Sequence, residues 1–369
     1  MTPRGRKRIP VWLAVVVLLA AAGLALALRY ESSLRFTLAL ALPATEGWLR
    51  FETPAREEVT IPGDGGSLRA DLYRPGQPRG ALLLVHGLSR AGRRHPELAR
   101  LARLLAEHGR LVLVPEFVGL TRFGLSGKEV EEIRVAIRFL RGLGHPVGVA
   151  GFSFGAGPAL LAAADDSSIP LVGSFGGYAD LRHVITYIST GVHEFRGLRY
   201  VQHQEEYNRW KLLALLAGFV EDERDRRLLE AIGERKLANP SESTGALEGG
   251  LGTSGRSVLA LVLNRDEKAV EPLMARLPSR ARETFERLSP LPVAPRLPGR
   301  LLIAHGTHDD SIPFTESLRL AEAAGGRARV AILQSFHHLG PQPFWAALRH
   351  WIQDGWNLLR LVDDLLAEP

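Results

Sequence analysis

The sequence of 369 residues contains no cysteine. This absence excludes disulfide bonds, a thiolate nucleophile, zinc sites built from cysteine and lipid attachment through a cysteine side chain. It is compatible with export from the cell but does not demonstrate it. Any nucleophilic catalysis by this chain must therefore use another side chain.

The sequence also lacks a basic stripe of the kind that binds nucleic acid. The formal net charge is +6, but the first ten residues, "MTPRGRKRIP", contribute four cations and so most of this excess. No later run of lysine and arginine is interleaved with aromatic residues, as a nucleic-acid surface would require. We expect no nucleic-acid partner.

An uncharged run follows this basic segment, from Val11 to Leu28. As a helix it would be roughly 27 Å long, close to the ~30 Å hydrocarbon thickness of a membrane. We expect residues 1–30 to form a basic N-terminus and one transmembrane anchor in the cytoplasmic membrane. Residues 31–56 would be a membrane-proximal linker, with the catalytic domain on the extracytoplasmic side. Two alternatives remain: a cleaved signal peptide ending near "ALA" at 25–27, which gives a secreted or periplasmic protein, and a buried helix of a soluble protein.

Short apolar runs then alternate with helical patterns. After two strand patterns, "EEVTIPG" and "SLRADLYRP", the run "ALLLVHG" at 81–87 is short and continuous, which is typical of a strand buried on both faces of a parallel sheet. Segments with helical spacing separate three further runs, "RLVLVPEF", "PVGVAG" and "IPLVGSFGG". This alternation predicts an α/β fold with a mostly parallel sheet and helices on both faces.

The alternation stops near Tyr178 and resumes at "GRLLIAHGTHDDSIP". We expect residues 57–177 and 299–369 to form the core, and residues 178–298 to form a mostly helical cap insertion over the site. Within the cap, the Gly/Ser-rich segment 239–255 is expected to be a mobile linker.

The last helical pattern carries a stripe of large apolar residues. Trp345, Leu348, Ile352, Trp356 and Leu359 share one face at helical spacing. We expect this face to pack against the sheet, with a role at the membrane interface as the alternative.

The segment "GFSFGAG" at 151–157 holds the most specific motif of the chain. It is not a phosphate-binding Walker loop, since Pro158 and not lysine follows Gly157, and its glycine spacing does not match a dinucleotide fingerprint. It does match G-x-S-x-G between a predicted strand and a predicted helix. Such a tight turn holds the Ser153 hydroxyl above the sheet edge, where the N–H groups of the helix start can stabilise an oxyanion.

With this motif the chain resembles the α/β-hydrolase family over roughly residues 57–366, except for the insertion. The segment "VHGLSRAG" is similar to the family's oxyanion segment, which implies the N–H groups of Leu88 and Phe154 as the two oxyanion-hole donors. The segment "HGTHDDSIP" is similar to the one that carries the family's acid. That similarity implies Asp309 as the acid, with Asp310 as the weaker alternative.

The family places its catalytic histidine after the last strand, where this chain has "FHHLG". The resemblance implies His338 as the general base, because an apolar residue follows it, and leaves His337 as the alternative. Ser153, Asp309 and His338 occur in the order of the fold. The implied chemistry is acyl transfer, in which the serine attacks a carbonyl, the histidine takes its proton and the aspartate orients the imidazole.

The expected function is that of a membrane-anchored serine hydrolase, with a small-molecule or lipid carboxylic ester as substrate. Peptidase or acyltransferase activity would use the same chemistry. The alternative is a catalytically inactive hydrolase-like module that binds partners at the membrane. We expect no cofactor and no metal, because no H-E-x-x-H motif or carboxylate-rich set accompanies the histidines at 305, 308, 337 and 338.

Two neighbouring segments are expected to have lesser roles. His86, in the "HG" turn of the oxyanion segment, is expected to be structural. The segment "GRRH" is expected to be a solvated loop, with contact between Arg93 or Arg94 and an anionic substrate as the alternative.

Overall fold

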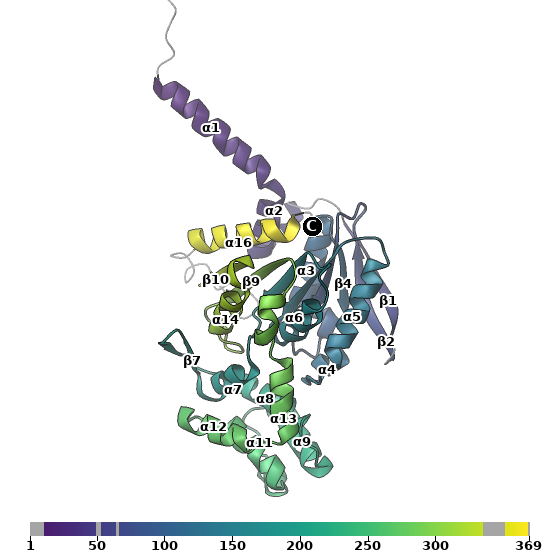
Figure 1. Ribbon diagram of the computed structural model, residues 1–369, viewed down its shortest axis with the longest axis vertical. Helices are drawn as coiled ribbons and strands as arrows, with labels where there is room; N and C mark the ends of the chain where they lie inside the picture. The colour runs from purple at the N-terminus through teal and green to yellow at the C-terminus, as the bar shows by residue number, and fades with distance from the viewer. Residues whose placement is uncertain (1–10, 49–52, 64–65, 335–350, 368–369) are drawn as a thin grey trace, which may run out of the picture.

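One sheet of eight strands organises the molecule, in the order β1-β2-β4-β3-β5-β6-β9-β10 (Figure 1). The computed structural model describes residues 11–48, 53–63, 66–334 and 351–367. The strands are β1 (Ala55–Gly63), β2 (Gly66–Arg74), β3 (Ala81–Val85), β4 (Leu111–Pro115), β5 (Val147–Phe152), β6 (Leu171–Phe175), β9 (Arg300–Gly306) and β10 (Ala328–Leu333). β2 pairs antiparallel with β1 and with β4, and every other pairing in this sheet is parallel. The expectation of a mostly parallel sheet is confirmed.

The strand order creates a crevice at the carboxyl ends of β3 and β5. These two strands are neighbours, but the chain continues from β3 to β4 on one side and from β5 to β6 on the other. Connections that leave in opposite directions open a crevice there, where ligands bind in open α/β sheets. Val85 lies opposite Gly151 in the β3–β5 register. The "HG" turn after β3 and the serine turn after β5 therefore emerge side by side.

Helices cover both faces of the sheet, as expected. One buried apolar cluster joins the sheet to α2 (Glu31–Ala41), α3 (Pro96–Glu107) and α16 (Trp351–Leu366). The other cluster joins the opposite face to α5 (Lys128–Arg141), α6 (Ala156–Ala164) and α14 (Phe314–Ala324). A short helix, α4 (Val118–Thr121), follows β4. The central strands are apolar throughout because both of their faces are covered.

The insertion forms a separate group of helices below the sheet in Figure 1. It contains α7 (Leu181–Thr190), β7 (Val192–Phe195), β8 (Leu198–Val201), α8 (Glu206–Ala217), α9 (Glu223–Ala238), α10 (Gly245–Gly249), α11 (Thr253–Leu263), α12 (Glu267–Ala275) and α13 (Ser279–Leu288). It is mostly helical, as expected, apart from the β7–β8 hairpin. Its two ends meet, since the Leu291 N–H donates to the Ala179 carbonyl at 3.0 Å.

The Gly/Ser-rich segment 239–255 is folded into the insertion, so the prediction of a mobile linker is wrong. It forms α10 and the start of α11. The carboxylate of Asp225 on α9 accepts the N–H groups of Gly252 at 2.6 Å and Gly255 at 2.7 Å. A Cβ on Gly255 would lie 2.9 Å from Asp225 Cγ, so the glycine permits this close approach.

The packing face of the last helix also differs from the prediction. In α16, Leu358 and Leu361 are buried, whereas Ile352 is 90% exposed and Trp356 is 50% exposed. Trp345 and Leu348 lie outside the described residues. The helix has two apolar faces, and helical periodicity alone does not show which of them meets the sheet.

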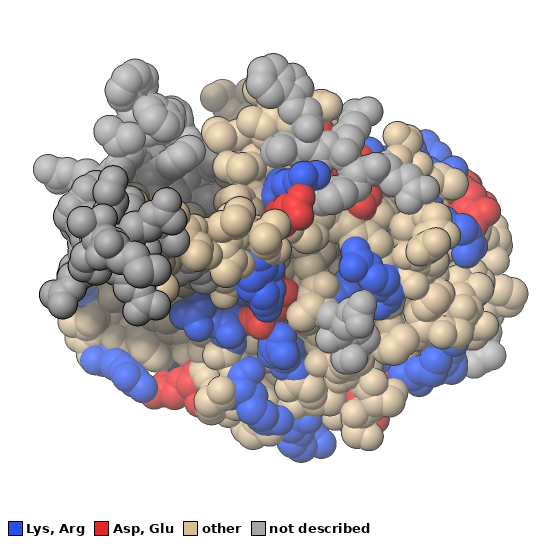
Figure 2. All heavy atoms as spheres, turned by 90° about the horizontal axis from the view of Figure 1, so that it is seen from above, with Lys and Arg blue, Asp and Glu red and all other residues tan. Residues whose placement is uncertain are grey.

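The helix α1 (Val11–Arg29) projects away from the domain (Figure 1). Its Leu18 and Leu19 are each 68% exposed. Within the described ranges, no helix is both long and apolar enough to cross a membrane, so the transmembrane helix expected from the sequence is not confirmed. Figure 2 views the molecule from this end, where Lys and Arg side chains are spread over the surface with Asp and Glu between them.

Candidate active site

Ser153 occupies a strained turn directly after β5. Its φ is +51°, in the left-handed region that residues other than glycine seldom adopt. Such a conformation costs about 1–3 kcal/mol and is found preferentially at functional sites. A short helical turn, Ser153–Gly155, continues into α6, so Ser153 stands at the N-terminal end of a helix. The tight turn expected from the G-x-S-x-G motif is therefore present.

The glycines of the motif are required by close packing. A Cβ on Gly151 would lie 2.4 Å from Ala156 Cα, and one on Gly155 would lie 2.2 Å from the His86 carbonyl oxygen. Both neighbours are backbone atoms, which cannot rotate away. The turn after β5 is thus packed directly against the turn after β3.

The same contact brings the expected oxyanion segment to Ser153. A Cβ on Gly87 would lie 3.2 Å from Ser153 Oγ, so the backbone before Leu88 passes beside the hydroxyl. Among the described residues, the Leu88 N–H donates to no backbone carbonyl. Phe154 follows Ser153 at the helix start, where N–H groups point toward an anion. Both donors implied by the family resemblance therefore lie on segments that border Ser153.

His86 has the structural role expected for it. Its Nε2 accepts the Phe117 N–H at 3.0 Å, so Nδ1 carries the proton and donates to the Gly87 carbonyl at 2.8 Å. Burial lowers the pKa of His86. The neutral ring fixes the turn that leads to Leu88 and has no free nitrogen for acid–base chemistry.

Asp309 is buried in the loop after β9. Its Oδ1 accepts hydrogen bonds from the N–H groups of Ser311 at 2.8 Å and Ile312 at 2.9 Å. Asp309 as a whole is 1% exposed. These hydrogen bonds favour a carboxylate of fixed orientation. The neighbouring Asp310 is more exposed.

His305 lies beside Asp309 but is not a candidate base. Its Nε2 is 3.3 Å from Asp309 Oδ2 and donates to the Ile312 carbonyl at 2.9 Å. Its Nδ1 accepts from the Ser317 hydroxyl at 2.7 Å. Both nitrogens are committed to holding the loop.

His337 and His338 lie outside the described residues, so the choice between them stays a prediction. In the described part of the chain, no group of three or more His, Asp or Glu residues could hold a metal ion.

Two cap helices hold the Asp309 loop in place. The Tyr187 hydroxyl on α7 donates to the Asp309 carbonyl at 2.6 Å, and the Asn208 amide on α8 donates to the Asp310 carbonyl at 3.0 Å. The sequence pattern did not identify either residue, because only the tertiary fold brings the insertion to this loop.

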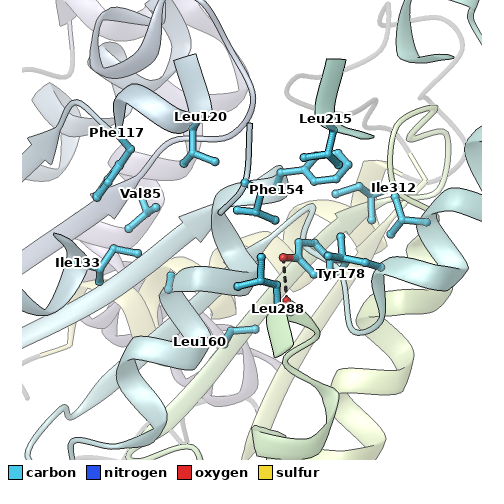
Figure 3. Close-up of a cluster of buried hydrophobic side chains, with 14 of the residues drawn as sticks. Val85, Phe117, Leu120, Ile133, Phe154, Leu160, Tyr178, Leu215, Leu288 and Ile312 are labelled. Atoms are coloured by element: carbon cyan, nitrogen blue, oxygen red, sulfur yellow. Dashed lines mark hydrogen bonds between the residues drawn. The ribbon is translucent and has the colours of Figure 1, made fainter. Parts of the chain in front are cut away.

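A buried apolar cluster joins the serine turn to the cap and to the Asp309 loop (Figure 3). Phe154 lies near Tyr178, Leu215 of α8 and Ile312, and its ring centroid is 5.8 Å from that of Tyr178. The Tyr178 hydroxyl donates to the Leu288 carbonyl at 3.0 Å. Movement of the Phe154 side chain would therefore disturb all three segments.

Ser153 opens into a cavity of about 490 Å³. This volume lies within the usual range for ligand pockets, roughly 300–1,000 Å³. His86, Leu88 and Phe154 line the cavity near the serine, and Tyr207 and Lys211 line it from α8. The remaining wall is mainly apolar and comes largely from α2, α3, α16 and the ends of the strands, with Arg90 on the loop after β3.

Lys211 is a cavity residue that the sequence analysis missed. Its ammonium lies 4.9 Å from the centre of the Tyr207 ring. Burial lowers the pKa of Lys211, while the nearby charges of Asp310 and Asp309 act in the opposite direction. The only available signal was a lysine within the apolar run "RWKLLALLA", which does not reveal what the side chain faces.

The segment "GRRH" is not a simple solvated loop. Arg93 is 2% exposed, and its guanidinium pairs with Asp71 and with Glu58, the latter at 2.6 Å. Arg94 is exposed and lies 3.4 Å from the same Glu58 carboxylate. Arg93 is committed to an internal ion-pair network, so contact between its side chain and a substrate is excluded.

Solved structures similar to this one come from several hydrolases. They include an esterase domain from Rhodothermus marinus (18% identity, 82% of this chain, 98% of that chain, TM-score 0.45). An α/β hydrolase from a Penicillium species has 18% identity over 83% of this chain and 98% of its own, with a TM-score of 0.49. An acylaminoacyl peptidase from Pyrococcus horikoshii has 14% identity, covering 84% of this chain and 40% of its own, with a TM-score of 0.46.

The chain resembles the α/β-hydrolases in fold. The sheet order and the strained serine turn are the observations that support this statement. Structures with so low a sequence identity do not indicate the substrate. No protein-family model and no curated protein matches the sequence.

Proposed function

We propose that the protein is a serine hydrolase that cleaves carboxylic esters by acyl transfer. The observation that carries the proposal is the strained Ser153 at a helix N-terminus, packed against the backbone before Leu88 and open to a ligand-sized cavity. This combination of nucleophile, oxyanion donors and cavity is what acyl transfer needs.

In the proposed mechanism, Ser153 Oγ attacks the ester carbonyl carbon while His338 takes the hydroxyl proton. The carbonyl oxygen becomes an oxyanion and accepts the N–H groups of Leu88 and Phe154. His338 then gives its proton to the leaving alkoxide oxygen, and the alcohol departs from the acyl-enzyme. Water, deprotonated by the same histidine, releases the acid and restores Ser153. Asp309 orients the imidazole and stabilises its cation throughout. The residues require no cofactor for these steps.

A fluorophosphonate probe tests the proposal, because it reacts with an activated serine and not with an inert one. We expect labelling of the wild-type protein at Ser153 and none of Ser153→Ala, together with hydrolysis of short p-nitrophenyl esters. A folded protein that neither reacts nor hydrolyses any ester would instead favour the inactive binding module. Peptide substrates assayed beside the esters would separate esterase from peptidase activity.

We also propose that the N-terminal end attaches the domain to a membrane, with the catalytic domain on the extracytoplasmic side. Exposed apolar side chains gather there, on α1 and on neighbouring elements: Leu34 of α2 is 41% exposed, and Trp356 of α16 makes an edge contact with Tyr30 at 6.2 Å. A surface of this kind is typical of membrane contact.

The full chain should sediment with membranes, and a chain without residues 1–30 should not. A C-terminal alkaline phosphatase fusion should be active; an inactive fusion would contradict the orientation.

A further inference from the structure

The cavity that contains Ser153 extends along one face of the sheet to the end of the molecule that carries α1. Its floor beside the serine is formed by Phe152 and Phe175, whose ring centroids are 5.2 Å apart. Both side chains are only partly buried, although they face the apolar cluster beneath α3 and α16. Their exposure is to the cavity, which they line.

The far wall of the cavity is mostly apolar, although His95, Glu97 and Arg100 also line it. Phe36 and Leu40 come from α2, Leu101 from α3, and Leu358 and Leu361 from α16. The Arg100 guanidinium at this wall is paired with Glu46 and Glu97. Leu40 and Leu101 are partly buried, as side chains that border an open space would be.

The opposite end of the cavity has a different chemistry. Tyr207 and Lys211 of α8 line it beside the serine turn. The Lys211 ammonium lies over the Tyr207 ring, and the charges of Asp310 and Asp309 act on it. An ester placed with its carbonyl at Ser153 would thus have a polar region on the cap side and a long apolar region toward α2 and α16.

We infer that the substrates are esters with a long acyl chain, and that the chain lies between the sheet and the helices α2, α3 and α16. This inference rests on the proposed function and names its substrate class. The apolar wall of the cavity includes α2 and α16, which lie next to α1 in Figure 1. Because α1 and α16 carry exposed apolar side chains, a lipid ester could enter from a membrane held against that surface. The alcohol portion of the ester would then lie toward Lys211.

The acyl-length profile tests the inference. The full chain, in phospholipid nanodiscs, would be assayed with p-nitrophenyl esters from acetate to hexadecanoate. We expect kcat/KM to rise by up to about fourfold per added methylene, the value of burying one CH₂, until the cavity is filled. Leu40→Trp should lower the ratio of kcat/KM for decanoate over acetate by tenfold or more. Leu101→Phe narrows the same wall from α3 and should lower the same ratio.

Leu263→Trp is the matched control, because Leu263 lies on α11, is 44% exposed and does not line the cavity. It should leave the ratio unchanged. If acetate were hydrolysed at Ser153 but the profile were flat, or if Leu40→Trp behaved like the control, the acyl-chain site would be wrong and the esterase proposal would stand.

Binding of decanoic acid to Ser153→Ala, measured by calorimetry, gives a readout that does not depend on turnover. Tight binding that Leu40→Trp weakens would support the acyl-chain site in the cavity, even if no ester were hydrolysed. A lack of ester hydrolysis would contradict the proposed function alone. Absence of binding in both proteins would overturn the inference.

Discussion

Replacing Gly155 by alanine should damage stability and catalysis together. The new Cβ would lie 2.2 Å from the His86 carbonyl oxygen and 2.8 Å from the Val85 carbonyl oxygen. Carbon atoms prefer about 3.5–4.0 Å to a non-bonded neighbour, so the backbone after β3 must move by about 1 Å. The φ of Gly155 is −74°, which alanine adopts without strain. The whole effect is therefore steric.

The displaced segment leads to Leu88, the expected oxyanion donor. Overpacking of this kind costs about 1–3 kcal/mol of folding free energy. A 1 Å misplacement of a catalytic group costs about 10²-fold in rate, and complete loss of one oxyanion donor costs about 10²–10³ in kcat. We therefore expect Gly155→Ala to lower the free energy of unfolding by about 1–3 kcal/mol and kcat on a short ester by about 10²-fold or more.

Urea denaturation and steady-state hydrolysis of p-nitrophenyl acetate measure the two effects. Gly249→Ala is the control, because no atom lies within 4 Å of the added Cβ on α10. It should raise stability by up to about 1 kcal/mol and leave kcat unchanged. If Gly155→Ala retained wild-type stability and kcat, the packing of the β3 turn on the serine turn could not be what positions the oxyanion donors.

Three further predictions concern the expected triad and the buried His193. Asp309→Asn should lower kcat on an ester by about 10³–10⁴-fold by favouring the wrong imidazole tautomer, whereas Asp310→Asn should change kcat little; equal losses would reassign the acid. His338→Ala should lower kcat by several orders of magnitude and His337→Ala far less, and the reverse pattern in the same assay would transfer the role of base. Burial lowers the pKa of His193 to about 4, so the folded protein leaves it neutral while the unfolded chain binds a proton below about pH 6.5. The free energy of unfolding should therefore fall as pH decreases from about 6.5 to 4, by at most about 1.4 kcal/mol per pH unit from this group, and His193→Phe should remove that contribution in denaturation curves measured across this range.

The strand and helix pattern and the serine turn could be predicted because their causes are local. Runs such as "ALLLVHG" are apolar on both faces, and both faces of the sheet prove to be covered. The glycines at 151 and 155 serve contacts within one strand–turn–helix unit and its immediate neighbour. The spacing of the motif in the sequence reflects these local contacts, so the turn could be predicted from it.

The features that escaped prediction depend on contacts between distant segments. Asp225 gives the Gly-rich segment its structure from another helix, and Tyr187 reaches the Asp309 loop from the cap. Arg93 is buried because β1 and β2 supply its carboxylate partners. The last helix carries two apolar faces, and only the assembled sheet selects the one with Leu358. Residue type alone contains none of this information.

The most direct test of the central claim is the identity of the residue that carries the acyl group during turnover. The full chain would be mixed with p-nitrophenyl acetate, quenched in acid within the first turnovers and digested for mass spectrometry. Acetyl on Ser153 in the wild-type protein, with a burst of p-nitrophenol that Ser153→Ala lacks, is the expected result. Hydrolysis at the wild-type rate by Ser153→Ala, or acetyl on another residue of the active protein, would contradict the assignment of Ser153 as the nucleophile.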